Sequence, residues 1–187
     1  MIDTAQFAEM KKVRDNAREL FSLAQIDEVI ARLAKELTQT YSDKAPVLIT
    51  VMNGGLVLAG KLVQHLGFPL EMDYLHATRY RGETSGGDIE WIVTPTMSLT
   101  GRHVVILDDI LDVGTTLLAI IEACKLQGAA SVATCVLVDK EHDRKAAVGL
   151  KADFTGVVAE DAYLFGCGMD YKNYWRNAPG IYAVEGS

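Results

Sequence analysis

The stretch VVILDDILDVGTTLLAI, residues 104–120, places three aspartates between two apolar runs. The first run has the continuous apolar pattern of a strand that is buried on both faces. The second run is predicted to belong to a helix that begins near Gly114. Because carboxylates at the end of an apolar strand are costly unless something binds them, Asp108, Asp109 and Asp112 mark the first candidate for a functional site.

Strand and helix patterns alternate on both sides of this stretch. Strands are expected at residues 46–52, 70–78, 103–109, 131–139, 153–158 and 181–184, and helices at 22–41, about 54–66 and 114–127. Ser22 is expected to cap the first of these helices. The alternation predicts an α/β fold with a mostly parallel, twisted central sheet and helices on both faces. Ligands of such sheets bind beyond the carboxyl ends of the strands, which is where Asp108 and Asp109 are expected.

The overall composition restricts the class of protein and of partner. A chain of 187 residues, 49% apolar and 23% charged, suits one folded domain, and its net charge of −7 disfavours nucleic acid and anionic membranes as partners. The three cysteines have no metal-binding spacing, so reduced thiols of a cytoplasmic protein are expected. There is no N-terminal signal pattern and no apolar run approaching the roughly 20 residues that span a bilayer, so no membrane association is expected.

The turn from strand to helix suits a phosphorylated sugar. The N–H groups of a helix start attract an anion, Gly114 allows a close backbone approach, and Thr115 and Thr116 add hydroxyl donors. Asp108 and Asp109 could accept hydrogen bonds from sugar hydroxyls, directly or through Mg²⁺. Their ordinary role as caps and turn formers is the alternative, but three carboxylates beside Gly-Thr-Thr make it the less favoured one.

This stretch resembles the phosphoribosyl pyrophosphate (PRPP) motif of the type I phosphoribosyltransferases. The segments VLITVMNGG, TRYRGETSGGD, LVDK and AYLFGCGMDYKNYWRN follow the order and spacing of the hypoxanthine-guanine phosphoribosyltransferases, and the resemblance covers roughly residues 20–184. It implies a single domain, 1–187, with a small hood over the C-terminal strand ends, built from about 1–25 and 160–187. It also implies a homodimer or homotetramer.

The implied reaction is purine salvage, in which the phosphoribosyl group of PRPP is transferred to a 6-oxopurine. Hypoxanthine or guanine would give IMP or GMP and pyrophosphate, with Mg²⁺ as cofactor. Three alternatives stay open at this point: the same reaction with xanthine or another base, a non-catalytic nucleotide-binding regulator on the same fold, and a phospho-acceptor domain. The acidic charge balance disfavours a regulator that binds RNA.

The resemblance implies a role for individual residues on the PRPP side. Asp108 and Asp109 match the acidic pair that holds the ribose hydroxyls, and Arg176 matches a pyrophosphate contact. The 5′-phosphate loop is matched by Asp112, Val113, Gly114, Thr115 and Thr116, and the pyrophosphate loop by Asn53 and Gly54.

On the purine side, Asp112 matches the general base or acid near N7, and Lys140 the lysine that contacts the exocyclic oxygen O6. Tyr163 matches the aromatic residue that stacks on the purine, and Leu164 its neighbour at the base edge. Asp170 is expected at the purine site as well, and matches a Mg²⁺ ligand on its pyrophosphate side. Taken without the resemblance, Lys140 would be read as a surface lysine, Tyr163 as an ordinary aromatic residue and Asp170 as a turn residue.

Two positions depart from the family pattern. The pyrophosphate loop usually has a basic residue where this chain has Asn53. The expected mobile loop, 79–88, usually carries Ser-Tyr but here begins with Arg79 and Tyr80, followed by Arg81. We therefore hypothesise that Arg79 or Arg81 replaces part of the missing positive charge when this loop closes.

Overall fold

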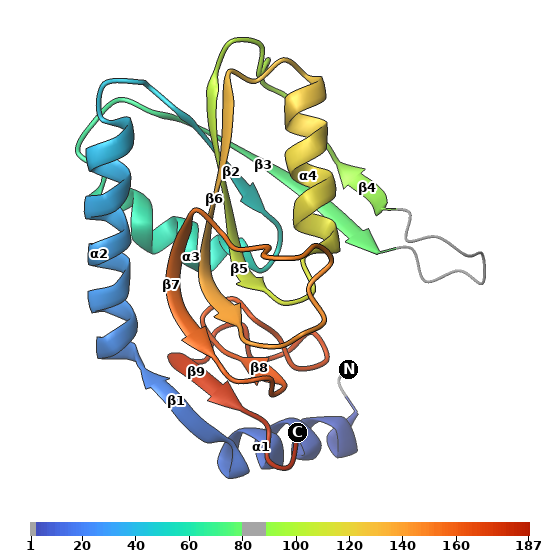
Figure 1. The fold of residues 1–187 in the computed structure, drawn as a ribbon. Helices are drawn as coiled ribbons and strands as arrows, with labels where there is room; N and C mark the ends of the chain where they lie inside the picture. Colours follow the sequence, from blue (N-terminus) through green and yellow to red (C-terminus); the bar gives the residue numbers. More distant parts are fainter. Residues whose placement is uncertain (1–2, 80–88) are drawn as a thin grey trace.

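The computed structural model describes residues 3–79 and 89–187, and a six-stranded sheet lies at its centre (Figure 1). The strand order is β4-β3-β2-β5-β6-β7. The strands are β2 (Val47–Val51), β3 (Glu71–Arg79), β4 (Ile89–Val93), β5 (His103–Leu111), β6 (Ser131–Lys140) and β7 (Phe154–Ala159). All neighbouring pairs are parallel except β3 with β4, which is antiparallel. The predicted α/β fold with a mostly parallel sheet is confirmed.

Helices cover both faces of this sheet, as predicted. The helices α2 (Leu23–Tyr41) and α3 (Gly55–Leu62) lie on one face and α4 (Thr115–Leu126) on the other (Figure 1). Successive side chains of a strand point to opposite faces. Accordingly, Val105 and Leu107 of β5 pack in the core beneath α2 and α3, whereas Val104 and Ile106 pack beneath α4. These two apolar layers fix the direction of β5 and therefore the position of the aspartates at its end.

A second, smaller sheet lies beyond the carboxyl ends of the central strands (Figure 1). Its order is β1-β9-β8, with β1 (Arg18–Ser22), β8 (Leu164–Phe165) and β9 (Gly180–Ala183). The helix α1 (Thr4–Asn16) packs on the C-terminal part of the chain, because the Trp175 indole donates to the Met10 carbonyl at 2.8 Å. These three strands lie within the two segments expected to form the hood. The exact limits of the hood and the assignment of the chain to a single domain remain predictions.

Several element boundaries differ from those predicted. The strand β5 continues past Asp109 to Leu111, so both acids of the pair lie within a strand rather than at its end. The helix α3 ends at Leu62 and continues as a short 3-10 turn, Val63–His65, instead of running to about residue 66. Four elements had not been predicted at all: α1, β1, β4 and β8. No helix in the described part of the chain is long and apolar enough to cross a membrane.

Candidate active site

Two cavities lie side by side at the carboxyl ends of the central strands. The Tyr163 cavity, of about 250 Å³, is lined by Asp109, Ile110, Asp112, Lys140, Tyr163, Leu164, Met169 and Asp170. The Asn53 cavity, of about 300 Å³, is lined by residues that include Asn53, Gly54, Asp108, Val113, Gly114, Thr116 and Arg176. Asp109, Ile110, Asp112 and Asp170 line both. The cavities therefore form one continuous site, and acidic residues lie where they meet.

The turn before α4 forms one wall of the Asn53 cavity. Gly114 has a φ of 87°, a left-handed conformation that favours glycine, and a Cβ there would overlap the side chains of Leu111 and Leu150. Of the two predicted hydroxyl donors, Thr116 lines the cavity, whereas Thr115 is not among the described residues that do. The backbone of this turn is thus shaped as an anion-binding helix start requires.

Asp108 and Asp109 form a tightly coupled acidic pair beside this turn. The Asp108 carboxylate accepts a hydrogen bond from the Asp109 backbone N–H at 2.9 Å. Burial and the neighbouring Asp109 charge raise the pKa of Asp108 well above its ordinary value. Burial also raises the pKa of Asp109, although the hydrogen bond with Asp108 and the Arg176 guanidinium oppose the shift. The pair therefore holds negative charge that a partner with hydroxyl donors or a cation would stabilise.

Two glycines bring backbone from different segments against Asp109. A Cβ at Gly54 would overlap the Asp109 carboxylate, and a Cβ at Gly168 would overlap the Gly54 carbonyl oxygen. Asn53 lines the same cavity, so the loop after β2 meets the end of β5 with no side chain between them. This close packing sets the width of the cavity on the side that the family resemblance assigns to pyrophosphate.

Arg176 connects the acidic residues of the two cavities. Its guanidinium lies 2.5 Å from an Asp170 oxygen and 3.8 Å from an Asp109 oxygen, and it donates to the Gly168 carbonyl at 2.6 Å. Asp170 also accepts from the Asn173 backbone N–H at 2.7 Å, so it forms a turn in addition to lining both cavities. Among the described residues that line the Asn53 cavity, Arg176 is the only one with a cationic side chain.

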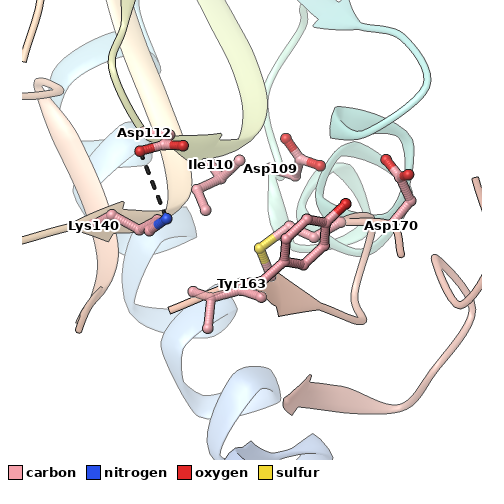
Figure 2. A pocket seen from close by; sticks show the side chains of 8 residues that line it. Asp109, Ile110, Asp112, Lys140, Tyr163 and Asp170 are labelled. Carbon is pink, nitrogen blue, oxygen red and sulfur yellow. Dashed lines mark ion pairs between the residues drawn. The ribbon is translucent and has the colours of Figure 1, made fainter. Parts of the chain in front are cut away.

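Lys140, at the end of β6, is buried, with 8% of its surface exposed. The interpretation as an ordinary surface lysine is therefore wrong. Its ammonium nitrogen lies 3.1 Å from an Asp161 oxygen and 3.7 Å from an Asp112 oxygen. Figure 2 shows Lys140 and Asp112 next to each other in the Tyr163 cavity, with Asp109 and Asp170 across it.

Tyr163 has 48% of its surface exposed, which is unusual for a large aromatic side chain and agrees poorly with a core role. Its ring packs edge to face with Tyr171 at a centroid distance of 5.5 Å. The buried Leu164 follows it in β8 and lines the same cavity. The Tyr163 ring therefore presents an open face beside Lys140 and Asp170 (Figure 2).

Some site residues had not been predicted from the sequence. His142 contacts Asp112, and Asp161 pairs with Lys140. His142 lies two residues after Lys140 and Asp161 lies two residues before Tyr163, and this proximity in the chain is the signal that could have identified them. Of the expected mobile loop, Arg79 ends β3, whereas Tyr80 and Arg81 lie outside the described residues.

Comparison with known proteins gives a consistent result. The phosphoribosyl transferase domain model matches residues 17–171. A hypoxanthine-guanine-xanthine phosphoribosyltransferase of Tritrichomonas foetus is 36% identical over 89% of this chain and 91% of its own. A hypoxanthine-guanine phosphoribosyltransferase of Bacillus subtilis is 36% identical over 89% and 92% of the two chains.

Solved structures agree with these sequence matches. The structure of a hypoxanthine-guanine-xanthine phosphoribosyltransferase superposes with a TM-score of 0.80 at 34% identity, covering 89% of this chain and 96% of that one. A hypoxanthine-guanine phosphoribosyltransferase from Bacillus anthracis superposes with a TM-score of 0.83 at 27% identity, covering 89% and 98%. With the acidic pair, the turn before α4 and the buried Lys140 in place, this chain belongs to the hypoxanthine-guanine phosphoribosyltransferase family.

Proposed function

We propose that this protein transfers the 5-phosphoribosyl group of PRPP to a 6-oxopurine, releasing pyrophosphate. A purine nitrogen forms a bond to the anomeric carbon as the bond from that carbon to the pyrophosphate oxygen breaks. The transition state carries positive charge on the ribose, as in glycoside cleavage. The observation that carries this proposal is that Lys140, Asp112 and Tyr163 line one cavity that shares four lining residues with a second, which contains the turn before α4.

The Asn53 cavity would hold PRPP. The turn at residues 113–116 provides backbone donors for the 5′-phosphate, and Asp108 and Asp109 accept from the ribose hydroxyls. The negative charge of the pair also favours the cation-like ribose of the transition state. Arg176 is placed to share its guanidinium between Asp170 and the departing pyrophosphate. It supplies positive charge in a cavity whose loop carries Asn53 instead of a basic residue.

The Tyr163 cavity would hold the purine. The exposed face of the Tyr163 ring offers a stacking surface. The Lys140 ammonium has three donors, of which Asp161 and Asp112 use at most two, so one is available to the O6 of a 6-oxopurine. In adenine an amino group replaces O6, so its N–H donors would face the N–H donors of Lys140 and no hydrogen bond would form between them. Asp112 lines both cavities, which supports its assignment as the group that accepts the purine proton.

A divalent metal ion suits the acidic residues at the junction of the cavities. We assign it as Mg²⁺ and Asp170 as its protein ligand, since Mg²⁺ prefers carboxylate oxygens and keeps several waters and substrate phosphates as ligands. One Asp170 oxygen already pairs with Arg176 and the other accepts from the Asn173 backbone N–H, but a carboxylate has about four lone-pair positions, so further coordination is compatible with these contacts. When bound, the ion would neutralise the pyrophosphate charge.

Two further expectations belong to this proposal. The protein is expected to act in the cytoplasm, which is supported by its free, buried thiols Cys124, Cys135 and Cys167. It is also expected to form a homodimer or homotetramer, as implied by the resemblance to its family.

Steady-state assays with PRPP and Mg²⁺ and each of hypoxanthine, guanine, xanthine and adenine test the proposal. We expect turnover with at least one 6-oxopurine and a far lower kcat/KM with adenine. The name of the Tritrichomonas foetus relative includes xanthine, so xanthine belongs in the comparison. Equal activity with adenine would contradict the role of Lys140, and activity with none of the four would favour a nucleotide-binding regulator.

A further inference from the structure

A histidine whose side chain is almost fully buried contacts the proposed general base. His142 belongs to the segment between β6 and β7, and only 4% of its side chain is exposed. Its Nε2 lies 2.6 Å from Oδ1 of Asp112. It is absent from the lining of both cavities in the described part of the chain, so it is placed to act on Asp112 and not on the substrate.

The backbone determines which imidazole nitrogen carries the proton. Nδ1 of His142 lies 3.0 Å from the Arg144 backbone nitrogen, whose N–H donates to it. A nitrogen that accepts a hydrogen bond has no proton, so the neutral ring is protonated on Nε2. His142 therefore donates from Nε2 to Oδ1 of Asp112, and the carboxylate is the acceptor.

The segment that carries His142 is fastened to the turn that carries Asp112. The Ala146 backbone N–H donates to the Val113 carbonyl at 2.8 Å, and the Lys145 ammonium donates to the Leu111 carbonyl at 2.8 Å. Lys145 also pairs with Asp139 at 2.6 Å. These contacts lie on both sides of Asp112 in the chain, so the distance between His142 and Asp112 is fixed by the backbone around them.

The two oxygens of Asp112 have different surroundings. His142 at 2.6 Å and Lys140 at 3.7 Å both approach Oδ1, and the described residues place no hydrogen bond or ion pair on Oδ2. Asp161 lies closer to the Lys140 ammonium, at 3.1 Å, and its two oxygens also accept from Arg144 at 2.6 Å each. His142 is thus the nearer partner of Oδ1, and Lys140 lies closer to Asp161 than to Asp112.

We propose that His142 is a positioning residue of the transfer reaction. It holds Oδ1 of Asp112 through Nε2–H, so that Oδ2 is the oxygen presented to the purine proton. This inference rests on the proposed function of Asp112 as the base near the purine. A residue that orients a general acid or base in this way commonly changes the reaction rate by about tenfold or more.

A matched pair of variants separates the effect of losing the Nε2–H donor from the effect of changing the side-chain volume. In H142Q the side-chain amide can donate from a position close to that of Nε2, whereas H142M is of similar length and cannot donate. We expect H142M to lower kcat by about tenfold or more with the KM for PRPP changed by less than about twofold, and H142Q to recover most of kcat. H142A gives the same comparison if Met does not fit.

A histidine in β5 of the central sheet provides the control. His103 is half-buried, and its Nδ1 lies 2.7 Å from the Ser131 hydroxyl, away from both cavities. H103A should keep the kcat of the unchanged protein, and the melting temperature of every variant is measured beside its kinetics. A loss of kcat in H142M that merely followed the loss in melting temperature, with no recovery in H142Q, would contradict the proposal.

A double-variant cycle tests whether His142 acts through Asp112. In the D112A background, adding H142M should cause no further loss of kcat, because no carboxylate is left to position. If D112A loses kcat while H142M keeps it, the inference about His142 alone is overturned. If D112A itself keeps normal kcat, the proposed role of Asp112 fails and the His142 inference falls with it.

Discussion

The backbone of Gly54 lies so close to the Asp109 carboxylate that a Cβ at position 54 would overlap it. The substitution G54A should therefore push Asp109 aside and narrow the Asn53 cavity. We expect a rise of about tenfold or more in the KM for PRPP, with kcat lowered as well, because displacing a positioned group by about 1 Å can cost 100-fold in rate.

The matched control is G60A in α3, where a Cβ would meet nothing within 4 Å. Alanine favours a helix interior over glycine by about 1 kcal/mol, so this variant should be at least as stable as the unchanged protein and equally active. Equal kinetics in G54A and G60A would contradict the assignment of Gly54 to the PRPP site.

Replacing Lys140 by Met tests the contact to O6 of the purine. Met fills the buried volume but has no donor, and both carboxylates beside it keep a partner, Asp161 in Arg144 and Asp112 in His142. We expect kcat/KM for hypoxanthine to fall by about 100-fold while the KM for PRPP changes little. The exposed Lys151 provides the control K151M, which should behave as the unchanged protein. A loss of PRPP affinity with no loss in kcat/KM for hypoxanthine would show that Lys140 contacts PRPP and not the purine.

Tyr163 is expected to contribute through its ring and not through its hydroxyl. Stacking of a base on an aromatic side chain contributes about 1–3 kcal/mol, so Y163A should raise the KM for the purine by about tenfold and leave the KM for PRPP nearly unchanged. Y163F keeps the ring and should retain nearly normal kinetics. If Y163F lost as much as Y163A, a hydrogen bond from the hydroxyl would replace stacking as the explanation.

The acidic pair should make stability depend on pH. Because burial and Asp109 raise the pKa of Asp108 in the folded state, the folded protein binds a proton there more tightly than the unfolded chain does. Its ionisation therefore destabilises the folded protein as pH rises from the ordinary aspartate pKa of about 3.9 toward the raised value, and the cost persists above it.

The variant D108N removes this ionisation. We expect it to melt at a higher temperature than the unchanged protein near about pH 7, with the difference shrinking as pH falls toward about 4. Its affinity for PRPP should fall at the same time, because an amide is a poorer acceptor for ribose hydroxyls. A melting temperature at neutral pH below that of the unchanged protein would show that Asp108 stabilises the fold as a carboxylate.

The pattern of apolar runs was sufficient to predict five of the six strands of the central sheet and the helices on both faces, but not the antiparallel strand β4. A buried strand such as β2 and a capped amphipathic helix such as α2 have unambiguous local patterns, and Ser22 indeed forms a capping box with Gln25. The extension of β5 to Leu111 was not predicted, because acidic residues normally end a strand pattern, while here they are accommodated by the cavities and by Arg176.

The elements of the hood were harder to predict. The helix α1 has only one buried residue, Met10, and β1 pairs with β9, which lies more than 150 residues further along the chain. Neither has a local pattern that indicates its partner. The same reason explains why His142 was missed: its importance comes from contacts with Asp112 and Arg144 that appear only once the segment after β6 has folded back over the turn.

The most direct test of the central claim is product detection in a reaction that contains the purified protein, PRPP, Mg²⁺ and hypoxanthine. The account predicts that IMP and pyrophosphate form in equal amounts, that both require PRPP and hypoxanthine together, and that D112A slows their formation strongly. Absence of IMP, or release of pyrophosphate from PRPP at the same rate without any purine, would contradict it.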